Sequence, residues 1–410
     1  MLMFKNTFKK ELLAYKNLGH NAQKLIKSIF LYNIISPLLG IFVNAFLWRE
    51  TKDFQKLAVY NLTIYLGIIL GFYLNGLLLK KYKASTLYTL GAFLQGFSIF
   101  LLIFITRTDY VIISFFGFIF GIAGGIFWAN RNLLTLKTTQ TNNRIYFSGL
   151  ESNIGTISDI AIPVSIGWLI VAGEAIHLYS PLDAYKFLAI LILLVITSIG
   201  FALKNLSITI PPPTQLLLSS ISSNWNKFRL FEFVLGLLSG IGGFVPVLMV
   251  LSVVGKENAL GSIQSLSAII AILVVSVLAK SLQVKHRIKL LGISVLLSIA
   301  GALVFSLTYS TLGVYIFYAM SALATPFGWI AMNSINYDLI DEEKDHNLHY
   351  AYVCDQEIYL NAGRITAIFI FILLDIFSNN AALRFTPLIV ACSQILLFFI
   401  AKRIKSDNEH

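Results

Sequence analysis

Long apolar stretches alternate with short polar ones along almost the whole chain. Each apolar stretch is close to the ~20 residues that an α-helix needs to cross a bilayer, so each one predicts a membrane-spanning helix. We distinguish about twelve of them. The predicted spans cover residues 24–48, 55–79, 85–106, 110–133, 146–172, 184–203, 228–253, 258–280, 287–308, 312–336, 349–377 and 382–403.

The eleventh predicted span carries polar residues in its interior. Glu357, Asn361 and Arg364 follow one another at steps of four and three residues, which places them on one side of a helix. Charged groups inside a membrane are costly, so they face a bundle interior or a water-filled cavity. The pattern predicts a polar pathway in which Glu357 binds protons. Arg364 would bind an anionic part of a solute or hold an internal acid.

Composition supports a membrane protein and explains the basic charge. Hydrophobic residues make up 57% and charged residues 12% of the chain, against about 25% charged in soluble domains. Most of the 31 Lys and Arg fall in connections on the side of the two termini. By the positive-inside rule both termini are expected in the cytoplasm, and no nucleic-acid partner is expected. Frequent Lys, Asn and Ile indicate an AT-rich bacterial genome, and hence a bacterial inner membrane.

The longest connection lies between the sixth and seventh predicted spans. It contains the triplet Pro211–Pro213, which cannot continue a helix. The linker therefore predicts two halves. We also expect the protein to be a monomer. The predicted parts are a basic cytoplasmic N-terminal segment (1–23), an N-terminal six-helix bundle (24–205), a cytoplasmic linker (206–227), a C-terminal six-helix bundle (228–403) and a cytoplasmic tail (404–410).

Features of the first half recur in the second. Trp128 and Trp329 lie about half a chain length apart, as do Glu151 and Glu357. The connection after the second span, 76–83, keeps a glycine followed by basic residues, although Lys80 stands where an acid is usual. With six plus six spans, the chain resembles the major facilitator superfamily. This resemblance implies an all-α integral membrane fold of two pseudo-symmetric bundles that rock against each other during transport.

Two further acids lie inside predicted spans. Asp159, near the middle of the fifth span, is a candidate to bind protons or solute. The alternative is a buried carboxylate held by another helix, in which case an Asp159–Arg364 pair would form a charge gate between the halves. Glu232, at the start of the seventh span, is expected at the membrane interface.

Amides and tryptophans complete the candidate set. Asn33 and Asn44 share one face of the first span, which suits a cavity wall or a helix–helix contact. Aromatic rings would suit a partly apolar solute. The candidate pathway residues are Asp159, Glu357, Arg364, Asn361, Glu151, Asn33, Asn44, Trp128, Trp329 and Asn333.

The sequence lacks the HExxH, GxSxG and GxxxxGK[ST] signatures of zinc proteases, serine hydrolases and ATP-driven transporters. We therefore predict a protein that is not an enzyme and needs no cofactor or metal. The expected function is secondary active transport of a small polar or amphipathic solute by alternating access, with protons as the coupling ion. Two alternatives stay open: a gradient-independent uniporter or lipid transporter, and a non-transporting receptor or scaffold on the same fold.

Overall fold

The computed structural model describes residues 15–16, 18–105, 107–139, 141–204, 206, 208, 211–218, 221–278, 287–342 and 348–407. Most of the predicted basic N-terminal segment and the last three residues of the predicted tail lie outside this part of the chain. Regular secondary structure in the described ranges is helical throughout.

Twelve segments of the described chain are long and apolar enough to cross a membrane, the number that the sequence predicts. The first six are α2 (His20–Pro37) with a π-helical turn (Leu38–Phe42) and α3 (Val43–Thr51), α4 (Phe54–Leu78), α5 (Ala84–Ile105), α6 (Tyr110–Thr138), α7 (Thr141–Ala175) and α8 (Pro181–Ala202). The last six are α9 (Ser223–Gly242) with α10 (Val245–Met249) and a π-helical turn (Val250–Val254), α11 (Glu257–Leu278), α12 (Arg287–Thr308), α13 (Thr311–Glu342), α14 (His349–Phe377), and α15 (Asn379–Ser393) with α16 (Ile395–Asp407).

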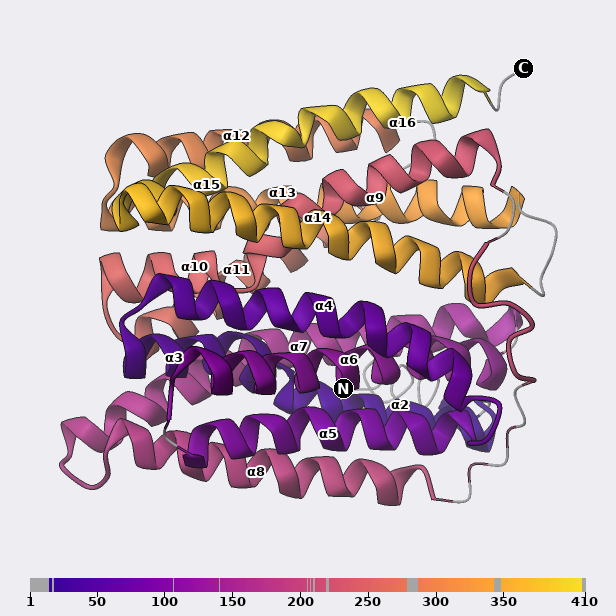
Figure 1. Ribbon diagram of the computed structural model, residues 1–410, viewed down its shortest axis with the longest axis horizontal. Coiled ribbons are helices and arrows are strands. Elements are labelled where there is room, and N and C mark those ends of the chain that lie inside the picture. Colours follow the sequence, from indigo (N-terminus) through magenta and orange to yellow (C-terminus); the bar gives the residue numbers. More distant parts are fainter. Residues whose placement is uncertain are drawn as a thin grey trace, which may run out of the picture.

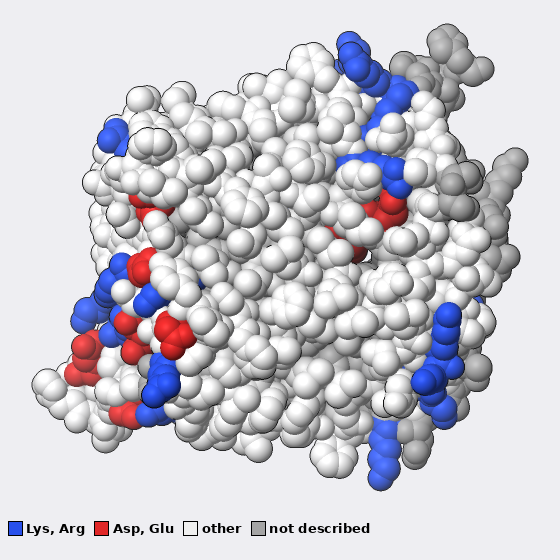
Figure 2. Space-filling view, viewed as in Figure 1, with Lys and Arg blue, Asp and Glu red and all other residues white. Residues whose placement is uncertain are grey.

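The helices run roughly side by side across the molecule (Figure 1). We call the end that holds the connection between α8 and α9 and the end of α16, at the right of Figure 1, the terminal end. The opposite end is the distal end. Figure 2 shows charged side chains near both ends and a broad band without them in between. A band of this kind is what a bilayer requires of a spanning protein.

The helices pack in two groups of six, which Figure 1 shows below and above one another. Contacts between α4 and α6, α5 and α8, and α2 and α7 hold the first group together, and contacts between α9 and α14 and between α12 and α13 hold the second. The groups meet mainly where α7 packs on α11 and α4 packs on α14. The predicted all-α fold with two bundles is therefore correct.

Glycines set the closest helix contacts. A Cβ atom at Gly261 of α11 would overlap the carbonyl oxygen of Pro163 in α7, and one at Gly167 of α7 would overlap the carbonyl oxygen of Glu257. Small residues let backbones approach in this way within a membrane. The two halves are thus in backbone contact over the distal part of α7 and α11.

Side chains fix where several helices begin at the distal end. The Asp53 carboxylate accepts hydrogen bonds from the first turn of α4, Asp109 accepts one from Ile112 N at the start of α6, and Ser180 and Asp183 form a capping box on α8. These side chains satisfy backbone N–H groups that have no partner within the helix.

The first span of each half is irregular. Span 1 changes to a π-helical turn directly after Pro37, and span 7 is interrupted between Gly242 and Val245 before its own π-helical turn. Pro37 has no N–H to donate, which fits the change of helix type at this position. The irregular parts meet, because Asn44 donates a hydrogen bond to the Gly243 carbonyl oxygen at 3.2 Å.

Candidate functional site

A cavity of about 570 Å³ lies among the middle parts of the spans. The first half contributes Ile41, Asp159 and Pro163, and the second half contributes the rest of the wall from α9, α10, α11, α12, α13 and α15. A volume of this size suits a small-molecule site. The cavity is thus lined from both halves of the molecule.

The cavity wall is mainly apolar, with hydroxyl groups and one acid. Its hydroxyl side chains are Ser239, Ser267, Ser294, Ser298, Ser321, Thr325 and Tyr318. Gln264 donates a hydrogen bond to the Tyr318 hydroxyl at 3.4 Å. Trp329, with 64% of its surface exposed, adds a large aromatic face.

Asp159 is the one ionisable side chain of the wall other than Tyr318, among the residues that the structure describes. Its side chain is exposed and the described wall contains no Lys or Arg. The predicted pathway residues Asp159 and Trp329 are therefore both brought to one cavity, and the charge available there is negative.

The polar stripe of α14 forms a continuous hydrogen-bonded chain. Asn361 Nδ2 donates to Glu357 Oε2 at 3.1 Å, and Arg364 Nη1 donates to Asn361 Oδ1 at 3.0 Å. Arg364 Nε donates to Ser239 Oγ of α9 at 3.0 Å. Since Ser239 also lines the cavity, the chain reaches from Glu357 to the cavity wall.

Arg364 also contacts the first half of the molecule. Its guanidinium carbon lies 5.3 Å from the centre of the Tyr65 ring of α4, within the range of a cation–π contact. The Tyr65 hydroxyl in turn donates to the Gly240 carbonyl oxygen at 3.2 Å. In this structure no ion pair joins Arg364 to Asp159 among the described side chains. The gate that the sequence suggested is not formed here.

Glu232, which the sequence places at the membrane interface, is covered by protein. Its side chain lies between α9 and α14 with only 3% of its surface exposed. Oε1 accepts a hydrogen bond from Gln356 Nε2 at 3.1 Å, whereas Oε2 has no partner. The burial of Glu232 follows from the packing of α14 on this part of α9.

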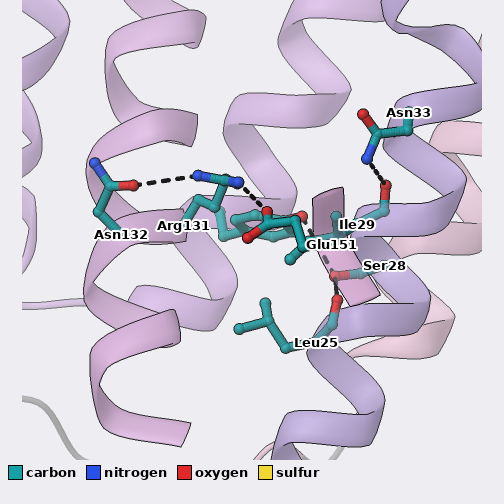
Figure 3. Close-up of polar contacts among 8 residues, drawn as sticks. Leu25, Ser28, Ile29, Asn33, Arg131, Asn132 and Glu151 are labelled. Atoms are coloured by element: carbon teal, nitrogen blue, oxygen red, sulfur yellow. Dashed lines mark hydrogen bonds and ion pairs between the residues drawn. The ribbon is translucent and has the colours of Figure 1, made fainter. Parts of the chain in front are cut away.

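The remaining acid of the candidate set lies in the first half. Glu151 of α7 pairs with Arg131 of α6, as Figure 3 shows. The Arg131 guanidinium also lies 4.9 Å from the Trp128 ring. Asn33 of α2 is nearby in Figure 3, where its amide donates to the Ile29 carbonyl oxygen of its own helix at 3.0 Å. Glu151, Asn33 and Trp128 thus form a second polar region, outside the cavity wall.

Two other predictions concern amides. Asn44 is buried and joins the halves through Gly243, while its Oδ1 accepts a hydrogen bond from Asn61 at 2.8 Å. It therefore serves a helix–helix contact, one of the two uses that the sequence left open. The side chain of Asn333 lies outside the described residues.

An ion pair closes the distal end between the halves. Arg49 of α3 donates two hydrogen bonds to the Glu257 carboxylate of α11, at 2.6 and 2.7 Å. The Glu257 side chain is 3% exposed and that of Arg49 27%. Lys256 and Glu174 form a second, exposed pair at 3.6 Å. The contact between Arg49 and Glu257 could not be predicted from local sequence, because the partners are 208 residues apart.

No three His, Cys, Asp or Glu side chains come together to hold a metal in the described part of the chain. The chemistry of the site therefore lies in a cavity with an acid, hydroxyls and aromatic rings, and in a neighbouring cluster with an arginine.

Comparison with known proteins gives a consistent result. A family model described as Major Facilitator Superfamily matches residues 26–348. A protein of Bacillus subtilis (strain 168) with the name "Uncharacterized protein YqgE" is 26% identical over 389 residues, which cover 92% of this chain and 87% of that protein.

Solved structures share the architecture. A bacterial homologue of the iron transporter ferroportin in an outward-facing state has a TM-score of 0.67 and 14% identity, covering 94% of this chain and 99% of that one. The nucleoside transporter NupG also has a TM-score of 0.67, with 13% identity over 94% of this chain and 100% of that one. At such identities the similarity concerns the fold alone.

Proposed function

The chain belongs to the major facilitator superfamily, and from this premise we propose that it is a secondary transporter that moves a small polar or amphipathic solute by alternating access. The observation that carries the proposal is the cavity of about 570 Å³, which both halves line in the middle of the spans. Solute sites of transporters that rock two halves lie near the middle of the membrane, at the contact of the halves. The predicted bundles, 24–205 and 228–403, are the proposed moving units.

The solute that this wall favours carries a positive charge. Asp159 supplies a carboxylate and Trp329 an aromatic face, and both groups attract cations. The hydroxyl groups can bind hydroxyl or amine groups of the same solute. Arg364, which the sequence offered for an anionic group, uses its donors on Asn361 and Ser239 instead. We therefore propose a small organic cation with polar substituents.

Protons are the proposed coupling ion, and Glu232 of α9, a buried acid with one oxygen that has no partner, supports this proposal. The charge distribution along the chain supports cytoplasmic termini, and with them a position in a bacterial inner membrane. The protein is proposed to act as a monomer, since the cavity is lined by residues of a single chain.

A thermal-shift screen of the purified, detergent-solubilised protein tests the solute class. The panel contains organic cations, neutral metabolites and organic anions of similar size. A ligand at a hundred times its dissociation constant stabilises the folded state by about 2.7 kcal/mol. We expect cations to raise the unfolding temperature of the wild type but not that of Asp159→Asn. The control is Asp109→Asn, which alters a helix cap at the distal end, and cations should raise its unfolding temperature as in the wild type.

A cation found in this way is then supplied to proteoliposomes that carry a pH gradient. Accumulation that requires the gradient supports coupled transport. A ligand that binds but never crosses the membrane in any gradient contradicts the proposal and favours a receptor or scaffold. Uptake that equilibrates without regard to the gradient favours a uniporter.

A further inference from the structure

We propose that Glu232 and Glu357 form a carboxyl pair that holds a single proton between α9 and α14, and that this pair is the proton-binding site of the protein. The claim that this proton is coupled to transport rests on the transport function proposed above. The claim that the pair binds a proton does not rest on it. The pair lies apart from the cavity wall, which contains neither residue.

Burial is the first observation. Glu232 is 3% exposed, and its Oε2 atom has no hydrogen-bond partner although it is fully covered. A buried carboxylate without partners costs several kcal/mol, whereas a protonated carboxyl is neutral and can donate a hydrogen bond. Protonation of Glu232 would therefore remove the uncompensated negative charge at Oε2, where the protein provides no hydrogen-bond donor.

The second observation is how tightly the two helices pack around the pair. A Cβ atom at Gly363 of α14 would overlap the Phe233 carbonyl oxygen of α9, and one at Gly236 would overlap the Leu360 carbonyl oxygen. Such contacts bring the two helix backbones together and limit the room for water beside the buried Glu232. The charges in the pair must therefore be balanced by protein groups or by protons.

Counting the charges gives the number of protons. On α14, Glu357 follows Gln356, whose side chain binds Glu232, and Arg364 is joined to Glu357 through Asn361. Asp355 is bound by Arg229, with Nε–Oδ2 at 2.7 Å, and by Trp225 Nε1 at 2.8 Å. Lys402 and Arg403 of α16 are exposed, and Arg384 of α15 donates to carbonyl oxygens of α12. Two carboxylates thus face one guanidinium, and one proton completes the balance.

The pair is connected to the cavity. Glu357 binds Asn361, Asn361 binds Arg364, and Arg364 binds Ser239, which lines the cavity and belongs to the same helix as Glu232. Arg364 also lies over Tyr65 of the first half. When the proton leaves, the second carboxylate competes for Arg364, so the proton can bias both the cavity wall and the contact between the halves.

Infrared difference spectroscopy on the purified protein tests the pair without any solute. Glutamate carrying ¹³C in its side-chain carboxyl separates the glutamate signals from those of aspartate. As the solution changes from mildly acidic to alkaline, we expect the wild type to lose the signal of one protonated, buried glutamate. Glu232→Gln and Glu357→Gln should each abolish this signal, because the remaining carboxylate is balanced by Arg364.

Arg364→Gln gives the opposite expectation. Without the guanidinium both carboxyls must be neutral, so the signal should double. Asp355→Asn is the matched control, because it alters a buried acid of the same helix pair that already has a cation, and it should leave the glutamate signal at its wild-type size. The proposal is overturned if the signal survives in Glu232→Gln, or if the wild type shows no titrating buried glutamate. If Glu232→Gln does not fold, the test uses Glu357→Gln instead. A signal of protonated glutamate that survives in Glu357→Gln also contradicts a proton shared by the pair.

Discussion

The ion pair between Arg49 and Glu257 holds the distal ends of the two halves together, and removing its negative charge should open that end. In Glu257→Gln the bidentate contact at 2.6 and 2.7 Å is lost and the Arg49 guanidinium remains without its carboxylate. The partners sit on α3 and α11, which belong to different halves. The cost therefore falls on the conformation in which the distal ends touch, and not on a conformation in which they are apart.

The magnitude follows from burial. Removing one partner of a buried, hydrogen-bonded charge pair costs about 2–5 kcal/mol. Glu257 is nearly fully covered, but Arg49 is 27% exposed and can be partly solvated, so the lower end of about 2 kcal/mol applies. Since 1.4 kcal/mol corresponds to a tenfold change in an equilibrium constant, the ratio of distal-open to distal-closed molecules should rise about 30-fold.

Distances between spin labels measure this ratio. The labels are attached at Ile176 and Leu312, at the distal end of each half, where the side chains are 67% and 66% exposed. The two native cysteines are replaced beforehand so that only these positions are labelled. The control is Lys256→Gln, which removes a charge from the adjacent, exposed pair and should change the free energy by about 1 kcal/mol or less. An unchanged distance distribution in Glu257→Gln, or an equal change in Lys256→Gln, would refute the reasoning.

Three further outcomes follow from packing and exposure. Gly363→Ala should destabilise the protein by about 1–3 kcal/mol, because the added methyl group overlaps a carbonyl oxygen of α9. Gly149 has open space around it, so Gly149→Ala should not lower stability, and thermal unfolding in detergent compares the two variants. Asn44→Ala should cost about 1–3 kcal/mol, since the Gly243 carbonyl oxygen loses this donor and buried Asn61 Nδ2 loses one of its two acceptors; an equal unfolding temperature would contradict this. An aqueous fluorescence quencher should reach Trp329, which is 64% exposed, but not Trp225, which is 1% exposed, so Trp329→Phe should reduce the quenchable emission and Trp225→Phe should not.

Local features of the sequence were sufficient for the helices. Each span must be apolar over about 20 residues to cross a bilayer, and this requirement acts on every span separately, so the number of spans could be read without knowing their neighbours. The helix ends were less accurate. The sixth predicted span begins at 184, for example, whereas α8 begins at Pro181, because the Ser180 cap sits in a polar stretch that hydropathy excludes.

The polar face of α14 was also predictable, since the spacing of Glu357, Asn361 and Arg364 is a property of one helix. The partners were not. Ser239 and Tyr65 come from α9 and α4, and nothing in their local sequence distinguishes them from other hydroxyl residues in spans. The composition of the cavity wall could not be predicted from the sequence either, because its serines and its threonine come from several spans.

The sequence by itself therefore determined the membrane class, the twelve spans, the two halves and the polar side of α14. Only the tertiary structure decided which polar groups meet. It buried Glu232 against Gln356 of α14, gave Arg364 the partners Asn361 and Ser239, and joined Arg49 to Glu257. The physical reason is that hydrophobic burial and backbone hydrogen bonding act on each span along the chain, whereas charge balance inside the bundle depends on which spans become neighbours.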